Sequence, residues 1–378
     1  MVTATYSAST SELARFYGYG CEEHAAVTSD GFVLILHRIT PRHGPRHGAP
    51  PVLVQHGLLQ CSETWVTTND ALAFALVDAG FDVWLANNRG NRYSCKHTRL
   101  RPDDRRYWDF SLDQHALIDL PTNVDAVLRV SGTQRLAYVG FSQGSAMGFA
   151  GFSLSPELSA KINVFVALAP AARAVGLQSG LLKTFVDCAP DSLYLLFGNT
   201  RIVPSAIWWR NNLSPGLFVT TIDLCVRYLF GWRTASMSRL RKKLCYPHLY
   251  SPSSVKTVVH WFQIVISNRF QMYDDSFTTN SAYTGAVPVE YPISQLSMPL
   301  ALFYGGEDKL PDFEWLLSVV PASATVARIP HYEHVDLMWA DDASDLVFNP
   351  VIDILAAHAD AVPVPVPAPR IPDSRRVA

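Results

Sequence analysis

Residues 136–144, LAYVGFSQG, join a short apolar run to a serine that is flanked by glycines. The run Leu136–Val139 is typical of a buried strand, and the small residues that follow Gly144 are compatible with a helix. A Gly-x-Ser-x-Gly pattern between a strand and a helix is typical of a sharp turn that raises a serine hydroxyl above a sheet. Ser142 is therefore a candidate nucleophile, and the alternative is a turn serine in an ordinary glycine-rich connection.

Further apolar runs on both sides of this turn predict a larger sheet. Strand-like runs occur at residues 32–39, 51–54, 82–86, 162–169, 299–304 and 325–329, and helical spacing occurs at 71–80 and 111–130. Alternating strands and helices predict an α/β fold, with a mostly parallel sheet covered by helices on both faces.

The alternation stops between residues 171 and 297, where the sequence is aromatic and mostly helical in pattern. We expect this stretch to form a helical cap over the carboxyl edge of the sheet, inside one domain spanning residues 12–360. Residues 1–11 are expected to be flexible. The tail at 361–378, AVPVPVPAPRIPDSRRVA, alternates proline with small residues, so we expect it to be disordered.

Composition excludes several classes of protein. Of the 378 residues, 48% are hydrophobic and 17% are charged, and the formal net charge is −2. A large core is therefore possible, and nucleic-acid binding through phosphate neutralisation is not expected. No apolar run approaches the roughly 20 residues that span a bilayer, and the N-terminus has no signal-peptide pattern. The six cysteines are scattered singly and none forms a Cys-x-x-Cys pair, so we expect neither a disulfide framework nor a zinc site. The serine-hydrolase chemistry inferred below needs no metal or organic cofactor.

A serine hydroxyl needs a histidine base, and the base needs a carboxylate that fixes its tautomer. In a sheet of this kind the order along the chain is serine, acid, histidine. Asp308 follows the tip of the strand at 299–304 and is our candidate acid. Glu307 and Asp312 are rivals, unless they are solvated loop charges.

Two histidines compete for the role of base. His334 directly precedes an apolar segment, residues 335–339, that could anchor it, whereas His331 lies beside Pro330 in a loop-like stretch. The pattern favours His334. A metal site at this histidine pair is not favoured, because no third cluster of ligands accompanies it.

Ester hydrolysis forms an oxyanion, which backbone N–H groups must stabilise. One donor is expected from the residue after the nucleophile, Gln143, and the other from the loop after an early strand. Leu58, in the loop that follows the strand at 51–54, is our candidate for the second donor. His56 in the same loop is interpreted as a structural histidine.

Several motifs together resemble the acid lipase family of α/β-hydrolases, which includes gastric and lysosomal acid lipases. The resemblance covers residues 12–358. The motifs that carry it are Gly18–His24, Thr28–Leu34, Gln55–Leu59, Asp82–Asn91, Tyr107–Ser111, Gly305–Asp308 and Tyr332–Trp339. It independently implies Ser142, Asp308 and His334 as the catalytic triad, with Leu58 and Gln143 at the oxyanion hole.

Within that family the chain is most similar to the fungal steryl ester hydrolases of lipid droplets. Phe141 stands where gastric and lysosomal members carry histidine, and the runs Ser253–Ile264 and Arg269–Tyr273 resemble the fungal pattern. The membrane-bound fungal members have an N-terminal hydrophobic anchor that this chain does not show. We therefore expect an intracellular protein without a transmembrane helix that binds a lipid droplet or membrane peripherally.

The resulting expectation is a serine carboxylester hydrolase that acts on steryl esters, triacylglycerols or both through an acyl-enzyme. An acyltransferase, a thioesterase, a peptidase and a catalytically idle lipid-binding protein are the alternatives. Two apolar stripes at helical spacing favour a cap that meets a lipid surface, and a core role is the alternative for each stripe. A tryptophan pair beside them suits the same surface. These residues are Phe218, Ile222, Cys225 and Leu229; Val255, Val258, Val259, Phe262 and Ile266; and Trp208 with Trp209.

Overall fold

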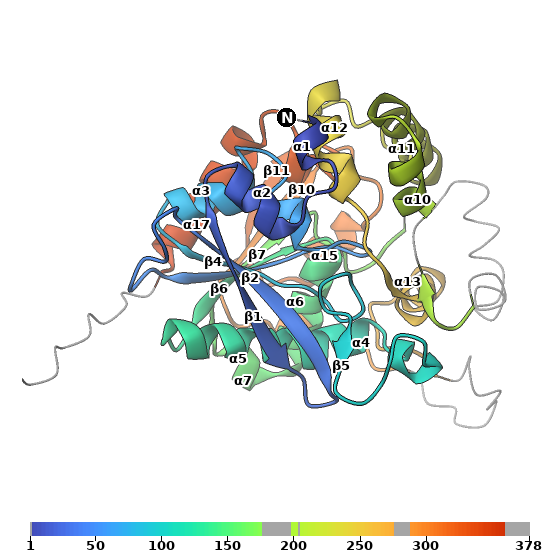
Figure 1. Cartoon of the computed structure of the whole chain (residues 1–378). Coiled ribbons are helices and arrows are strands. Elements are labelled where there is room, and N and C mark those ends of the chain that lie inside the picture. Colours follow the sequence, from blue (N-terminus) through green and yellow to red (C-terminus); the bar gives the residue numbers. More distant parts are fainter. Residues whose placement is uncertain (1, 176–197, 203–204, 276–287, 360–378) are drawn as a thin grey trace, which may run out of the picture.

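The computed structural model describes residues 2–175, 198–202, 205–275 and 288–359, and these form a twisted sheet flanked by helices (Figure 1). The strand order is β1-β2-β4-β3-β6-β7-β10-β11, with β5 paired to β2. From β4 to β11 all neighbouring strands are parallel, whereas β1, β2 and β5 pair antiparallel. The strands are β1 (Gly20–Val27), β2 (Phe32–Thr40), β3 (Pro51–Gln55), β4 (Asp82–Leu85), β5 (Lys96–His97), β6 (Leu136–Phe141), β7 (Ile162–Leu168), β10 (Leu300–Gly305) and β11 (Thr325–Ile329).

Helices cover both faces of this sheet, as the sequence predicted (Figure 1). On one face lie α2 (Thr10–Phe16), α3 (Leu72–Asp78), α16 (Asp336–Trp339) and α17 (Asn349–Ala357). On the other lie α4 (Leu112–Gln114), α5 (Leu120–Ser131), α6 (Gln143–Leu154), α7 (Pro156–Ser159) and α15 (Phe313–Val319). Shorter 3₁₀ and π turns are η1 (Ser62–Trp65), η2 (Arg105–Trp108), η3 (His115–Asp119), η4 (Tyr246–His248), η5 (Ile293–Gln295) and η6 (Ser344–Phe348).

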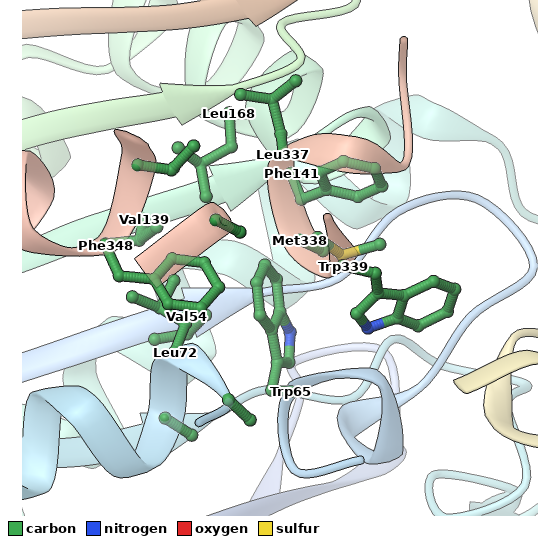
Figure 2. Close-up of a cluster of buried hydrophobic side chains, with 14 of the residues drawn as sticks. Val54, Trp65, Leu72, Val139, Phe141, Leu168, Leu337, Met338, Trp339 and Phe348 are labelled. Atoms are coloured by element: carbon green, nitrogen blue, oxygen red, sulfur yellow. The ribbon is translucent and has the colours of Figure 1, made fainter. Parts of the chain in front are cut away.

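Strand β6 shows why its sequence is a continuous apolar run. Ala137, Val139 and Phe141 pack into the core on one face, whereas Leu136 and Tyr138 pack into the core on the other. Successive side chains of a strand point to opposite faces, so a strand covered on both faces has no solvent-facing position. Figure 2 shows the first of these cores, where Phe141 lies among aromatic and aliphatic side chains that include Trp65.

The cap is helical where the structure describes it, and its yellow-green helices lie to one side of the sheet (Figure 1). It contains α10 (Ser205–Asn212), α11 (Pro215–Phe230), α12 (Arg239–Cys245) and α13 (Val255–Ser267), together with a small ribbon of β8 (Arg201–Ile202) and β9 (Ser253–Ser254). In α11 the side chain of Ser214 caps the first turn, and Gly231 ends the helix in the left-handed conformation. Residues 176–197 and 276–287 of the expected cap lie outside the described residues.

In the first apolar stripe of the cap, Phe218 and Ile222 are core, the alternative interpretation of that pattern, whereas Cys225 and Leu229 are half-buried. Phe218, Ile222 and Val226 are buried in the same cluster as strands of the sheet. A different face of α11 is open to solvent and carries large apolar side chains beside the exposed Thr220 and Arg227. These apolar residues are Leu217, Leu224 and Tyr228. The helix is thus hydrophobic on two faces, only one of which is covered by the described residues.

The N-terminal residues were expected to be flexible. They form α1 (Val2–Thr5) and then α2, whose start is fixed by a capping box between Ser9 and Glu12. His248 of the cap donates from Nε2 to the Thr5 carbonyl at 2.8 Å, and Thr5 is buried. These residues thus form helices and contact the cap, which is distant in sequence, and their flexibility stays a prediction.

Within the described residues, no helix has both the length and the apolar character that crossing a bilayer requires. The proline-rich stretch at 361–378 lies outside the described residues.

Candidate active site

Ser142 follows the last residue of β6 and immediately precedes the first residue of α6. Its backbone φ is +52°, a conformation that a residue with a side chain rarely adopts. The turn is tight, because a Cβ atom added at Gly144 would lie 2.5 Å from the Gln55 carbonyl oxygen. The strained serine and the close approach of α6 to β3 are the geometry that raises a serine hydroxyl above a sheet edge.

His334 connects Ser142 to Asp308. Its Nδ1 lies 2.7 Å from the Asp308 Oδ2 atom, and its Nε2 lies 2.8 Å from the Ser142 Oγ atom. The ionised carboxylate is an acceptor, so Nδ1 carries the proton and donates it, which leaves Nε2 free to accept from the serine hydroxyl. The Leu310 N–H donates to the other Asp308 oxygen at 3.1 Å. Asp308 and His334 are both buried, so water competes little with these bonds.

The rival residues lie elsewhere. His331 is 58% exposed, and its Nε2 faces the Asp342 carboxylate at 3.8 Å. Glu307 is exposed, and Asp312 caps α15 by accepting from the Trp315 N–H at 3.0 Å. Of these candidate acids and bases, the structure brings Asp308 and His334 to Ser142, and it does not bring the others.

The loop after β3 runs directly beside the serine. A Cβ atom added at Gly57 would lie 3.2 Å from the Ser142 Cβ atom, which places the neighbouring Leu58 backbone near the nucleophile. Gln143 is the first residue of α6, where backbone N–H groups have no carbonyl one turn earlier in the helix to bond. The two residues expected at an oxyanion hole therefore flank Ser142, from the loop and from the helix.

His56 fixes this loop through two hydrogen bonds of its imidazole ring. Its Nδ1 donates to the Gly57 carbonyl at 2.8 Å, and its Nε2 accepts from the Asn88 N–H at 3.2 Å. Burial lowers the pKa of His56 to about 4, so the ring is neutral near pH 7 and suits these two bonds. The geometry agrees with the structural interpretation of His56.

An apolar cavity of about 220 Å³ opens above Ser142 and His334. Its walls come from the loop after β3, the turn at the end of β6 and the cap. The cap side chains among its walls include Val226, Phe230, Trp232, Leu249, Trp261 and Val265. Trp261 of α13 also donates from Nε1 to the side-chain oxygen of Gln143 at 2.8 Å. Sequence reasoning missed this contact, since only the helical spacing of α13 was visible, not the face that meets the active site.

In the part of the chain that the structure describes, no cluster of three or more histidine, cysteine or acidic side chains could hold a metal ion.

In this structure a serine on a strand-to-helix turn is hydrogen-bonded to a histidine, the histidine is hydrogen-bonded to an aspartate, and backbone N–H groups lie beside the serine. Serine hydrolases with the α/β-hydrolase fold have this arrangement. Comparisons with known proteins give the same class. Residues 50–341 match the family model described as alpha/beta hydrolase fold, and residues 10–69 match a partial alpha/beta-hydrolase lipase region.

Curated relatives narrow the class further. A Schizosaccharomyces pombe protein named as a probable lipase is 41% identical over 355 residues, which is 92% of this chain and 80% of that protein. The human gastric triacylglycerol lipase is 33% identical over 367 residues, covering 92% of this chain and 90% of that lipase. Among solved structures, a soluble variant of the Saccharomyces cerevisiae monoglyceride lipase matches with a TM-score of 0.61 at 14% identity, over 90% of this chain and 96% of that chain, which shows the shared fold.

The chain belongs to the α/β-hydrolase family and, within it, to the acid lipase group. It is a carboxylic ester hydrolase that acts on lipid esters.

Proposed function

We propose that the protein hydrolyses water-insoluble fatty-acyl esters, steryl esters or triacylglycerols or both, through an acyl-enzyme on Ser142. The observation that carries the proposal is the Ser142–His334–Asp308 chain of hydrogen bonds at the floor of an apolar cavity. The acyl group would lie in the cavity with its carbonyl carbon above the serine Oγ atom. No cofactor is needed for this chemistry.

The reaction has two halves. Ser142 Oγ attacks the ester carbonyl while His334 Nε2 takes the hydroxyl proton, and Asp308 stabilises the imidazolium that forms. The oxyanion accepts hydrogen bonds from the backbone N–H groups of Leu58 and Gln143. The tetrahedral intermediate collapses, His334 returns the proton to the leaving alcohol, and the acyl-enzyme remains. Water then attacks the acyl carbonyl while His334 takes one of its protons. The second tetrahedral intermediate collapses, the bond to Ser142 Oγ breaks, His334 returns the proton to that oxygen, and the fatty acid leaves.

Access to such substrates requires contact with a lipid droplet or membrane, because they are almost insoluble in water. The exposed face of α11 supports peripheral binding. Leu224, Tyr228 and Leu217 are 63%, 58% and 53% exposed, at spacings that place them on one stripe of the helix. Trp208 of the neighbouring α10 is 62% exposed and is an amphipathic residue suited to a membrane–water interface. We propose that this face binds the lipid surface reversibly.

The catalytic proposal is tested with the purified full chain and cholesteryl oleate, triolein and a short soluble ester assayed in parallel. Ser142→Ala should lower turnover on all three by several orders of magnitude and abolish labelling by a fluorophosphonate probe. Product analysis with an added alcohol separates hydrolysis from acyl transfer. Labelling at a residue other than 142, or an active Ser142→Ala protein, would refute the mechanism.

The surface proposal is tested by flotation with liposomes or lipid droplets. The double variant Leu224→Ser/Tyr228→Ser should float less and lose hydrolysis of triolein or steryl ester, while keeping hydrolysis of a short soluble ester. Leu117→Ser is the matched control, because Leu117 is an exposed leucine outside the cap. Equal loss on soluble and insoluble substrates would mean that this face serves folding instead of lipid access.

A further inference from the structure

The imidazole of His334 contacts two aromatic rings, one from the sheet domain and one from the cap. The Phe141 ring centroid is 5.1 Å from that of His334, with planes inclined at 56°. The Trp232 ring centroid is also 5.1 Å away, with planes inclined at only 8°, so the indole stacks on the imidazole. Phe141 belongs to the turn beside the nucleophile, whereas Trp232 follows the end of the cap helix α11. The cap thus reaches the proposed catalytic base directly.

Trp232 is itself the middle ring of a stack. Phe230 packs on it with centroids 4.4 Å apart and planes inclined at 23°. Gly231 between them has a left-handed backbone, which ends α11 and lets the chain turn back toward His334. The indole N–H of Trp232 is buried and has no acceptor among the described residues. Hydrogen bonding of the indole therefore does not explain its position, and stacking does.

A carboxylate next to His334 anchors the same segment. Glu333 accepts the Thr234 N–H at 2.6 Å and the Arg233 N–H at 2.8 Å, and it is buried. Thr234 has a φ of +51°, which is unfavourable for a β-branched residue and persists only where the surroundings hold it. Bonds from N–H groups to a carboxylate are stronger than neutral ones and supply that hold. The residue before His334 thus fixes the chain directly after Trp232.

We propose that Trp232 is a positioning residue of the catalytic centre, held by Glu333, that orients the His334 ring and stabilises its imidazolium. This inference rests on the proposed function, because it requires His334 to act as the base. When His334 takes the serine proton, positive charge develops beside the negative face of the indole, in a site from which water is largely excluded. The planar stack also keeps Nδ1 and Nε2 aligned with Asp308 and Ser142. The cap would therefore assist the chemical step as well as shape the cavity.

The experiment measures kcat and KM separately with a short soluble ester and compares Trp232→Leu with Trp232→Phe. We expect Trp232→Leu to lower kcat by roughly thirtyfold, the scale of a desolvated cation–π contact. Trp232→Phe should recover most of that loss, because a phenyl ring can still stack. The cavity-wall variant Val265→Ala is the control for altered binding, and it should change KM more than kcat. Melting curves establish that each variant is folded, and Trp232→Met replaces Trp232→Leu if the latter does not fold.

A double-variant cycle tests the anchor. Glu333→Gln alone should lower kcat in the same direction, and in the Trp232→Leu/Glu333→Gln protein the combined loss should be smaller than the product of the single losses. Unchanged kcat in Trp232→Leu, equal losses in the Leu and Phe variants, or a full product of losses in the cycle would each overturn the proposal. Ser142→Ala distinguishes failure of the proposed function from failure of this inference. If Ser142→Ala stays active, the proposed function fails. If it is inactive while the Trp232 variants keep wild-type kcat, only the role of Trp232 fails.

Discussion

Asp336 is a buried carboxyl whose replacement by asparagine should stabilise the protein in a pH-dependent way. One of its oxygens accepts the Glu333 N–H at 2.7 Å, and the side chain of Ser236 also hydrogen-bonds the carboxyl. Burial raises the pKa of Asp336 from 3.8 to about 6; the two hydrogen bonds oppose this rise, and the nearby charge of Glu333 adds to it. At 1.36 kcal/mol per pKa unit, this shift changes the free energy of unfolding by at most about 3 kcal/mol between the protonated and the charged form.

The sign follows from proton linkage. Because the folded protein binds the Asp336 proton more tightly than the unfolded chain, this stabilising contribution is complete below pH 3.8 and is lost as the pH rises through about 6. An asparagine carries no charge at any of these pH values. Asp336→Asn should therefore raise the free energy of unfolding by about 2–3 kcal/mol at pH 8 and should change it little near pH 4.

Urea denaturation at pH 8 and pH 4 measures both values. Asp345→Asn is the control, because Asp345 is an exposed carboxylate in the π turn that follows α16, and its replacement should change stability by less than about 0.5 kcal/mol at either pH. An equal effect of Asp336→Asn at the two pH values would refute the linkage argument, and destabilisation at pH 8 would mean that the charged form makes a favourable contact.

Three other predictions follow from the site and its supports. His334→Ala should lower turnover of a soluble ester by at least about 10³-fold, while His331→Ala should stay within about twofold of wild type; the reverse would move the base to His331. Phe218→Ala should lower the free energy of unfolding by about 3–5 kcal/mol because Phe218 is buried in the core that the cap shares with the sheet, and denaturation measures this loss. Burial by itself would raise the pKa of Glu63, but Glu63 accepts hydrogen bonds from His248, Tyr93 and Arg92. These partners outweigh burial and lower its pKa to about 2. Its contribution of up to about 3 kcal/mol should be present above pH 4.5 and lost as the pH falls toward 2, so Glu63→Gln should destabilise the protein at pH 7 and much less at pH 2, and a pH-independent loss would contradict this.

The parts of the site that follow from short-range geometry were predictable from sequence. The strand, the tight turn and the helix around Ser142 are adjacent in the chain, and glycine at position 144 is required because the backbone of β3 lies within contact distance. The acid and the histidine were predicted from their places after the last two strands, because parallel strands bring their carboxyl ends to one edge. The strand signals were also strong, since a strand covered on both faces is apolar throughout.

The cap was less predictable, because an apolar residue at helical spacing does not say which neighbour covers it. The pattern in α11 suggested Phe218, Ile222, Cys225 and Leu229 as a possible lipid-binding stripe, yet Phe218 and Ile222 are core and the open face carries Leu224 and Tyr228. The N-terminal residues looked flexible because their partner, His248, is more than 240 residues away in sequence. Both features depend on tertiary contacts between segments that are far apart in the sequence.

The sequence by itself determined the class of fold, the nucleophilic turn and the order of the candidate acid and base, because strand patterning and turn geometry are local. The sequence also favoured His334 over His331, but only the tertiary structure shows the hydrogen bond from His334 to Ser142 and the stacking of Trp232 on the His334 ring. Residues 232 and 334 lie about 100 positions apart, and no periodicity or spacing links them. Their contact exists because α11 ends at Gly231 and because the Glu333 carboxylate binds the two N–H groups that follow Trp232.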